Sequence, residues 1–359
     1  MKEVYPDRSG MSISKVPDGF ADQLCRMDPP VTLVVNDGTR PSPAQVLKSL
    51  LPFLGASFRI IFATGAHRPP DPVERRRILG AVADMGIQET SNDCDDGSQV
   101  FIGTTSRGTP VELHPWLLEG SVLGINTVEP HYFAGFTGGR KSFLPGCASR
   151  KTITSNHFLA CFPGSAAGRL HGNPVHLDME EGAGLLYERT PCLMVNGTSM
   201  GEVFSGLPGE SFVKAAEKAA VIHGVPVEEP FSSLTVTPGG PLEGSLYQSL
   251  KAVFLWADAV ETGGSLVLES PCNEGLGAPQ MDRILKLSAG ILNPPKDRSD
   301  YLLGDHAALR LSSIRRRIRL SLETDFRFDD YGFPERAGSG GARLEGAGFL
   351  FPVMRGTDA

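Results

Sequence analysis

Histidines, lysines and one unusually glycine-rich segment are the residues of this sequence best suited to chemistry. The segment HYFAGFTGGRKSFLPG (131–146) opens with a histidine, and Lys141 stands at its centre among four glycines. Glycine lowers stability unless the backbone must turn sharply or approach another group closely. The composition of this segment therefore predicts a bound group beside Lys141.

The segment has some features of a phosphate-binding loop. A Walker A loop requires a glycine immediately before its lysine, and here Arg140 stands before Lys141. The backbone N–H groups of Gly138 and Gly139, with the two cations, can still hold a phosphate. A plain surface turn with a solvated lysine is the alternative, and the glycines beside an Arg-Lys pair favour the binding loop.

Three of the eight histidines lie beside loops of the predicted fold. His67 follows a predicted strand at 58–65, His131 follows one at 121–128, and His157 lies in a predicted helix. One imidazole cannot form a metal site alone, because protein sites need three or four ligands. If His157 binds a metal, a cofactor must supply the other ligands. The remaining histidines show no paired arrangement, with His176 ambiguous: His114, His171, His176, His223 and His306.

Segments with the pattern of strands alternate with segments with the pattern of helices. This alternation predicts an α/β fold in which mostly parallel sheets carry helices on both faces. The predicted strands cover 31–37, 58–65, 99–105, 121–128, 190–197, 234–240, 264–270 and 349–354. The predicted helices cover 42–55, 72–86, 209–224 and 244–259, with a further one beginning near Lys151.

Polar side chains follow three of these strands directly. Asp37 and Arg40 come after the first strand, His67 after the second and His131 after the fourth. In open α/β sheets, ligands bind at the carboxyl ends of the strands. We therefore expect these four residues to meet at one edge of a sheet.

The length of 359 residues favours two domains, because a single core rarely grows this large. A break is predicted near GVPVEEPFSS (224–233), after which the alternation of strand and helix begins again. We predict domains over 1–228 and 229–359, each a mostly parallel sheet flanked by helices. The active site is expected in the cleft between them.

Charge and cysteine content exclude several classes of protein. The net charge of −7, from 34 basic and 41 acidic residues, argues against a nucleic-acid partner. The six cysteines have no CxxC spacing, which argues against a disulfide framework or a thiolate zinc site. No secretion signal and no bilayer-length apolar stretch is found, so a cytoplasmic protein without a membrane partner is predicted.

Together these motifs resemble the nickel-pincer lactate racemase family of 2-hydroxy-acid racemases and epimerases. The spacing of ten residues from His131 to Lys141, and of sixteen from Lys141 to His157, agrees with that family. The resemblance covers roughly residues 31 to 310. Its motifs are DGTRP (37–41), ATGAHR (63–68), HYFAGFTGGRKSFLPG (131–146), NH (156–157), GNPVH (172–176), YQSLK (247–251) and CNEGLG (272–277).

The resemblance implies a nickel cofactor, pyridinium-3,5-bisthiocarboxylic acid mononucleotide, tethered to Lys141. His157 would be the protein ligand of nickel, while two sulfurs and a ring carbon of the cofactor fill the other positions of a square-planar site. Gly138, Gly139 and Arg140 would contact the cofactor. Enzymes that make this cofactor and insert its nickel would be partners of the protein.

The resemblance also implies roles around the substrate, a small 2-hydroxy acid. His67 and His131 would form the acid/base pair, and Asp37 would orient the cofactor. Substrate carboxylate or cofactor would be held by Arg40, Gln248 and Lys251, the last two from the C-terminal domain. Arginine can bind a carboxylate in a bidentate way.

The chemistry of a 2-hydroxy acid explains why such a cofactor and a pair of histidines would be needed. Its α-hydrogen is too weakly acidic for a histidine to remove as a proton. The resemblance implies that it leaves as hydride to the cofactor while a histidine takes the hydroxyl proton. The resulting 2-keto acid takes the hydride back on its other face, which inverts the configuration.

Two other functions stay open on sequence grounds. A phosphate-binding transferase can use the glycine-rich loop, although the Walker A pattern is incomplete. A non-catalytic carrier of the nickel cofactor needs Lys141 and His157 but not the histidine pair. The segment after about residue 310 is shorter and richer in glycine than expected for the family. Which 2-hydroxy acid is the substrate is also open: lactate, malate, 2-hydroxyglutarate, an aromatic hydroxy acid or a sugar acid.

Overall fold

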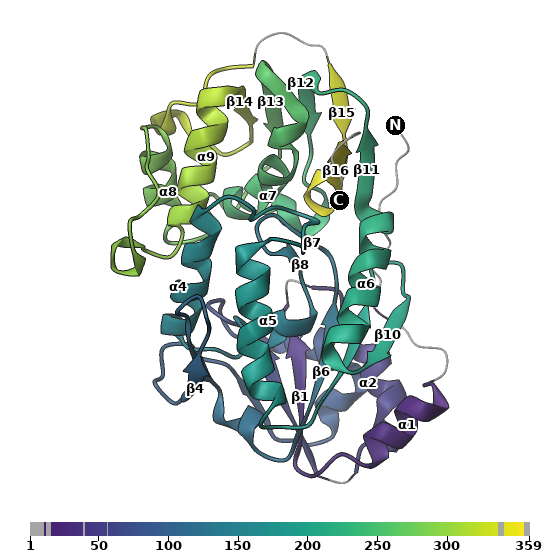
Figure 1. The fold of residues 1–359 in the computed structure, drawn as a ribbon. Coiled ribbons are helices and arrows are strands. Elements are labelled where there is room, and N and C mark those ends of the chain that lie inside the picture. Colours follow the sequence, from purple (N-terminus) through teal and green to yellow (C-terminus); the bar gives the residue numbers. More distant parts are fainter. Residues whose placement is uncertain (1–10, 12–15, 39, 56, 337–340, 355–359) are drawn as a thin grey trace.

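The protein is described from a computed structural model (Figure 1). The structure describes residues 11, 16–38, 40–55, 57–336 and 341–354. It confirms the predicted α/β class, with parallel-dominated sheets flanked by helices.

The helices vary in length from single turns to four turns. The α-helices are α1 Asp18–Cys25, α2 Ala44–Leu50, α3 Pro72–Leu79, α4 Arg150–Phe158, α5 Pro174–Tyr187, α6 Pro208–His223, α7 Leu246–Trp256, α8 Met281–Ser288 and α9 Asp305–Arg317. The short 3-10 helices are η1 Leu51–Phe53, η2 Gly80–Asp84, η3 Pro115–Leu118, η4 Gly139–Ser142, η5 Leu159–Cys161, η6 Gly240–Glu243, η7 Ala257–Ala259, η8 Arg298–Asp300, η9 Asp329–Tyr331 and η10 Ala347–Phe349.

The strands form two larger sheets and three two-stranded pairs. Their bounds are β1 Val31–Asn36, β2 Phe58–Ala63, β3 Glu89–Ser91, β4 Val100–Thr104, β5 Pro110–Leu113, β6 Ser121–Thr127, β7 Pro130–His131, β8 Gly135–Phe136, β9 Cys192–Gly197, β10 Val203–Gly206, β11 Gly224–Val227, β12 Phe231–Val236, β13 Val260–Glu269, β14 Arg319–Glu323, β15 Ala342–Leu344 and β16 Phe351–Met354.

The first sheet has six strands in the order β10-β9-β6-β1-β2-β3 and forms the lower half of the molecule in Figure 1. All neighbours are parallel except β10 with β9. Val31 of β1 pairs with Phe58 of β2 and with Ser121 of β6, so the three strands run in step. Their carboxyl ends therefore reach the same edge of the sheet, as the strand-end pattern predicts.

The central strand β1 is apolar on both faces because both faces are covered. Leu33 and Val35 belong to the core cluster that includes residues of α1, α2 and α3, while Val34 belongs to the cluster that includes residues of α4 and α5. All three side chains are fully buried. This two-sided burial holds β1 rigidly and fixes the position of the loop that follows it.

The second sheet has four parallel strands in the order β14-β13-β12-β15 and lies in the upper half of Figure 1. Helices α7, α8 and α9 pack with it in a single large core cluster, at whose centre Trp256 is fully buried. The indole N–H of Trp256 donates to the carbonyls of Ala347 and Leu350. The C-terminal segment is thereby attached to α7.

Some details differ from the sequence predictions. The strand predicted at 234–240 is β12, Phe231–Val236, and the residues after it form a loop and η6. The strand predicted at 99–105 is β4, which pairs only with β5 and not with the large sheet. Helices α1, α5, α8 and α9 lie outside the predicted helix ranges.

The last strand of the described residues lies beside β11. The predicted closing strand is present as β16, and it pairs with β11 in a separate two-stranded sheet. The two strands of this sheet lie on opposite sides of the predicted domain boundary at 228/229. That boundary stays a prediction. Among the helices of the described residues, none has the length and apolar character required to cross a membrane.

Candidate active site

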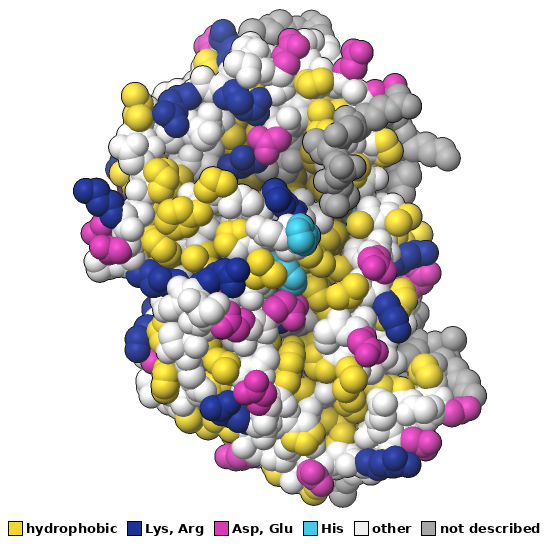
Figure 2. Space-filling model, viewed as in Figure 1, with side chains coloured by type: hydrophobic (Ala, Val, Ile, Leu, Met, Phe, Trp, Pro, Cys, Tyr) yellow, Lys and Arg dark blue, Asp and Glu magenta, His cyan; other side chains and the backbone are white. Residues whose placement is uncertain are grey.

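A cavity of about 470 Å³ is lined by residues of both halves of the chain. Its walls come from the loops after β1 and β2, from the segment between β7 and η4, and from α4, α7, α8 and α9. Figure 2 shows histidine side chains in the region between the upper and lower halves of the molecule. The volume is typical of a small-molecule site.

Most of the site residues predicted from the sequence line this one cavity. Those that line it are Asp37, Arg40, His67, His131, Gly138, Lys141, His157 and Lys251. Three others are absent from its lining: Gly139, Arg140 and Gln248. The structure therefore brings together residues that lie more than two hundred positions apart in the sequence.

His67 is held by the carboxylate of Asp37. The Nδ1 atom of His67 lies 2.7 Å from Oδ2 of Asp37, and half of the His67 side chain is exposed. An imidazole whose Nδ1–H donates to a carboxylate presents Nε2 as an acceptor when it is neutral. His67 is thus arranged to accept a proton at Nε2, and Asp37 orients this histidine directly.

His131 lies in a drier and more cationic environment. Its ring stacks on Tyr132 with centroids 5.4 Å apart and meets the edge of Phe133 at 4.5 Å. Burial lowers the pKa of His131 well below its usual value, and nearby cations, first Lys141 and then Arg40, lower it further. The amide of Ala134 donates to Nδ1 over 3.3 Å, which leaves Nε2 for other partners.

Lys141 lies on η4 inside the cavity. Its ammonium group is 5.7 Å from the centroid of the Phe133 ring. Burial lowers the pKa of Lys141 well below its usual value, and the cations Arg140, Arg40 and Lys251 act in the same direction. The neutral amine, which is the nucleophilic form, is therefore favoured here more than at a solvated lysine.

His157 offers an unpaired ring nitrogen. It lies in the last turn of α4, which begins at the N-cap Ser149, and Nδ1 of its ring is buried with no hydrogen-bond partner among the described residues. Burial lowers the pKa of His157, and His306 and then Lys141 lower it further, so the neutral imidazole is favoured. A neutral imidazole beside a cavity is a common ligand for nickel, copper or zinc.

Two cations of the cavity come from different halves of the chain. Arg40 forms an ion pair with Glu129 at 3.0 Å, and Glu129 is almost fully buried. Lys251 donates to Oε1 of Gln248 over 2.5 Å. Gln248 does not line the cavity itself but bonds to a residue that does. Beyond its bond to Glu129, the guanidinium group of Arg40 has further N–H donors that suit an anionic ligand.

Arg140, a predicted cofactor contact, is absent from the cavity lining and bonds to its own loop. Its guanidinium group donates to the carbonyls of Ala134, Phe136 and Gly138, and it lies over the Phe212 ring at 4.3 Å. It is 1% exposed. These bonds within its own loop show that Arg140 shapes the glycine-rich segment from inside.

The glycines of this segment are required by packing within the protein. A Cβ atom on Gly138 would lie 2.7 Å from Cγ2 of Val128, and one on Gly139 would lie 2.6 Å from the Phe212 ring. Both glycines also have positive φ, which disfavours other residues. Close packing against α6 is therefore one reason for glycine at position 139, and its contact with a bound group stays a prediction.

The structure also brings to the cavity a histidine that shows no paired arrangement in the sequence. His306 in α9 is 8% exposed and lines the cavity wall. Its ring centroid lies 5.9 Å from that of His157. Burial lowers the pKa of His306 to about 4. No local motif marks His306, because its neighbours come from distant parts of the chain.

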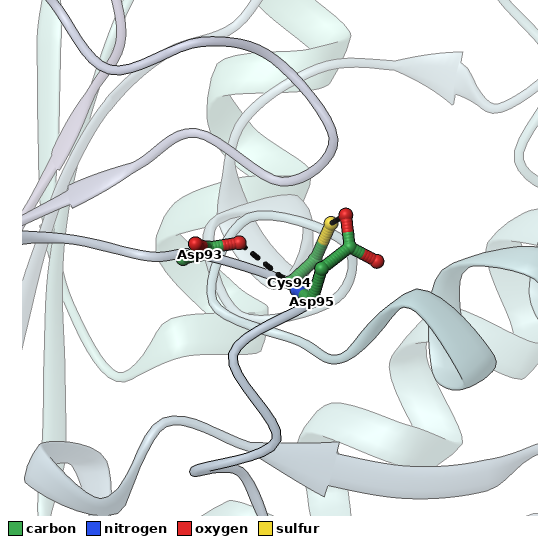
Figure 3. A group of neighbouring side chains, drawn as sticks. All are labelled: Asp93, Cys94 and Asp95. Carbon is green, nitrogen blue, oxygen red and sulfur yellow. Dashed lines mark hydrogen bonds between the residues drawn. The ribbon is translucent and has the colours of Figure 1, made fainter.

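A second cluster of possible ligand atoms lies outside the cavity, in the loop after β3. Figure 3 shows Asp93, Cys94 and Asp95, whose ligand atoms lie within 4.8 Å of one another. Asp95 is already paired with Arg150 at 2.6 Å. Burial raises the pKa of Cys94 to about 11, which keeps the thiol protonated. The cluster is therefore a hydrogen-bonded turn in which Arg150 neutralises the charge of Asp95.

The N-terminal part of this chain is similar to lactate racemases. Residues 20–168 match the family model described as the lactate racemase N-terminal domain. A lactate racemase from Thermoanaerobacterium thermosaccharolyticum is 29% identical over 271 residues, which are 72% of this chain and 63% of that protein. A lactate racemase from Lactiplantibacillus plantarum is 29% identical over 284 residues, 71% of this chain and 63% of that protein. The match thus spans less than two thirds of either relative.

Solved structures extend the likeness to nearly the whole chain. The apoprotein of the Thermoanaerobacterium thermosaccharolyticum lactate racemase has a TM-score of 0.79 at 23% identity, covering 98% of this chain and 89% of that one. A crystal structure of a protein from Thermotoga maritima has a TM-score of 0.72 at 18% identity, covering 94% of this chain and 97% of that one. At these identities the structural matches show a shared fold.

Proposed function

We propose that this chain, whose residues 20–168 match the lactate racemase N-terminal domain, racemises or epimerises a 2-hydroxy carboxylic acid. The observation that supports this most strongly is that His67 and His131 line one cavity together with Arg40 and Lys251. Two imidazoles can exchange the hydroxyl proton, and two cations can bind the carboxylate. Lactate is the first substrate to test.

The cavity also fits the nickel-pincer nucleotide that the family resemblance implies. His157 offers a neutral imidazole with an unpaired nitrogen, which suits nickel, and Lys141 offers an amine whose pKa is lowered. We propose that His157 would bind the metal and Lys141 would hold the organic part. When bound, this group supplies an electron-poor ring carbon that takes the α-hydrogen with its bonding electrons and returns it.

In this proposal His67 acts on the hydroxyl of one enantiomer. Its Nε2 accepts the hydroxyl proton as the C2–O bond becomes a carbonyl, which gives the 2-keto acid. The Nδ1–H remains bonded to Asp37, whose negative charge stabilises the imidazolium that forms. Asp37 is therefore assigned to His67 and no longer to the cofactor.

His131 is assigned to the opposite enantiomer. Inversion changes the side on which the C2 oxygen lies, so a second imidazole must exchange its proton. Because Nδ1 of His131 accepts from the amide of Ala134, the neutral ring carries its proton on Nε2, and this N–H is assigned as the hydrogen-bond donor to the C2 oxygen. Burial and the neighbouring cations both lower its pKa, which keeps the ring neutral near pH 7.

The carboxylate would lie between Arg40 and Lys251, which approach the cavity from opposite halves of the chain. Glu129 and Gln248 hold these cations in place through one hydrogen bond each. A substrate bridging both cations would be fixed in orientation while the C2 substituents are exchanged.

The two alternative functions have less support. A phosphate-binding transferase loses one of its two loop cations, because Arg140 points into the protein. A non-catalytic carrier of the cofactor would have no use for the bond between Asp37 and His67, since that bond orients an imidazole for proton transfer. Neither alternative accounts for a histidine pair in one cavity.

The first experiment produces the chain together with cofactor-making and nickel-inserting enzymes. We expect an intact mass raised by a mononucleotide adduct, mapped to the peptide containing Lys141, with nickel by metal analysis. Polarimetry should then show loss of optical rotation with lactate or another 2-hydroxy acid. An adduct-bearing, nickel-loaded protein that racemises no member of a broad 2-hydroxy-acid panel would refute the proposal and favour the carrier.

Single substitutions separate the assigned roles. His67→Ala and His131→Ala should each lower kcat by roughly 10²- to 10⁴-fold while nickel content stays near that of the parent protein. His157→Ala should lose nickel. His171→Ala, which changes an exposed histidine outside the cavity lining, is the matched control and should retain both. Full activity in both His67→Ala and His131→Ala would show that the mechanism is wrong.

A further inference from the structure

A chain of hydrogen bonds that the proposed function does not use ends at the wall of the cavity. Nδ1 of His306 lies 2.6 Å from the hydroxyl of Tyr301, and Nε2 lies 3.2 Å from the hydroxyl of Tyr132. Tyr132 and His306 both line the cavity. Tyr132 follows His131 in the glycine-rich segment, whereas the other two residues come from η8–α9 in the second half of the chain.

The direction of these bonds follows from their lengths. The contact of 2.6 Å at Nδ1 has the short length typical of a hydroxyl donor, whereas the contact of 3.2 Å at Nε2 has the longer length of an N–H donor. The Tyr301 hydroxyl therefore donates to Nδ1 of His306. A ring nitrogen that accepts a hydrogen bond carries no proton, so the proton of His306 is on Nε2. Nε2–H therefore donates to the oxygen of Tyr132.

This arrangement leaves the Tyr132 hydroxyl with its own proton to donate. The Tyr132 ring is held by stacking on His131, at 5.4 Å and 11°, and on Phe254, at 4.9 Å and 28°. Lys251 lines the same cavity and both smaller pockets that Tyr132 also lines. A fixed hydroxyl donor beside a cation is an arrangement that binds an anionic oxygen.

We propose that Tyr132 donates a hydrogen bond to an oxygen of the substrate, an anionic 2-hydroxy or 2-keto acid, and that His306 and Tyr301 are positioning residues that set the direction of this bond. The inference rests on the proposed function and adds a substrate contact to it. It also gives α9 a role, because the second half of the chain would direct a donor located in the first half.

The test measures pyruvate binding to the nickel-loaded enzyme by titration calorimetry, and KM and kcat for lactate by polarimetry. Tyr132→Phe keeps the ring and its stacking but removes the hydroxyl. We expect pyruvate affinity to fall about tenfold and KM to rise by a similar factor, the typical effect of a hydrogen bond to a charged group. Tyr331→Phe is the matched control, because its hydroxyl bonds to Asp282 outside the cavity lining.

The positioning role of His306 is tested by a double substitution. His306→Ala should weaken pyruvate binding to about the same extent as Tyr132→Phe. In the Tyr132→Phe background, His306→Ala should cause no further loss, because its effect passes through the missing hydroxyl. A purely structural role would lower the affinity again in the double variant, and that result would overturn the assignment of His306.

The remaining outcomes separate this inference from the proposed function. If Tyr132→Phe binds pyruvate as tightly as the parent protein while racemisation continues, Tyr132 is not a donor and the racemase proposal stands. If the loaded parent enzyme racemises no 2-hydroxy acid and does not bind pyruvate, the proposed function fails and this inference fails with it.

Discussion

The two histidines proposed to exchange the substrate proton lie in contrasting surroundings. His67 is half exposed and bonds to the carboxylate of Asp37, whereas His131 lies among aromatic rings and cations. An anionic partner stabilises an imidazolium, and a dry cationic setting opposes one. The same residue type is therefore prepared for proton acceptance on one side of the cavity and held neutral on the other.

The loops that carry the two histidines are also stabilised differently. The loop after His67 relies on surface polar contacts, with Asp71 capping α3 and Arg68 paired with Glu74 at 2.6 Å. The segment after His131 relies on close packing, with Gly139 against Phe212. Surface contacts of this kind contribute little each, whereas close packing tolerates almost no change. We expect the His67 side to tolerate substitution and the His131 side to resist it.

The largest expected effect comes from breaking the contact that distinguishes the His67 side. Asp37→Asn should lower kcat about 100-fold, because the amide keeps the shape but cannot hold the imidazole in the required tautomer and charge state. Nickel content should stay near that of the parent. A loss of less than about threefold in kcat would show that the bond between Asp37 and His67 is not used.

The cationic side can be examined without activity, through the reactivity of Lys141. Its lowered pKa should make carbamylation by cyanate at pH 7 at least about tenfold faster than at Lys286, whose pKa is raised by its hydrogen bond to Asp282. Peptide mass spectrometry of the cofactor-free protein measures both rates. Equal rates at the two lysines would contradict the proposed environment.

Acid should destabilise the protein through its buried histidines. Burial lowers the pKa of His306 to about 4. Burial, and to a smaller extent Arg140, lowers the pKa of His176 to about 3. A histidine in the unfolded chain has a pKa of about 6.5. Below a pH of about 6.5 these histidines bind protons in the unfolded chain but stay neutral in the folded protein. The free energy of unfolding therefore falls as the pH falls. Each such histidine contributes at most about 1.4 kcal/mol per pH unit over this window.

Urea unfolding at pH 7.5, 6.5 and 5.5 measures this dependence. His176→Gln removes one of the buried imidazoles without changing a residue of the cavity lining. Its free energy of unfolding should depend less steeply on pH than that of the parent protein. Parallel curves for parent and variant would mean that His176 takes up protons equally in both states.

The smallest effect is expected at the surface cap on the His67 side. Asp71→Ala removes the N-cap of α3, whose carboxylate accepts from the amides of Val73 and Glu74. It should lower the free energy of unfolding by about 1 kcal/mol and leave kcat nearly unchanged. An unfolding free energy equal to that of the parent, or a kcat lowered tenfold, would contradict this division of roles.

Sequence patterns predict much of the arrangement around the first sheet. Asp37, His67 and His131 directly follow strands whose apolar composition marks them as buried and parallel, and parallel strands end at one edge. The tendency of ligands to bind at strand ends is therefore enough to predict that these three residues lie together. Lys141 and His157 are marked by their spacing to His131 and by the family resemblance.

Other features could not be read from local patterns. In the sequence Arg140 resembles a phosphate ligand, but its guanidinium group donates hydrogen bonds to carbonyls of its own loop. His306 stands in no paired arrangement in the sequence, but α9 packs it against Tyr132 from the other half of the chain. In both cases the partner is chosen by the way the segments pack, and a linear pattern contains no information about that choice.

Local composition and periodicity were enough to predict the central strands of the first sheet and the reactive side chains that follow β1, β2 and β6. The tertiary structure alone decided the environment of each reactive group. Whether a histidine meets a carboxylate or a cation, and whether an arginine faces a cavity or its own backbone, depends on residues brought near by folding. Those long-range neighbours set the pKa, the tautomer and therefore the chemistry.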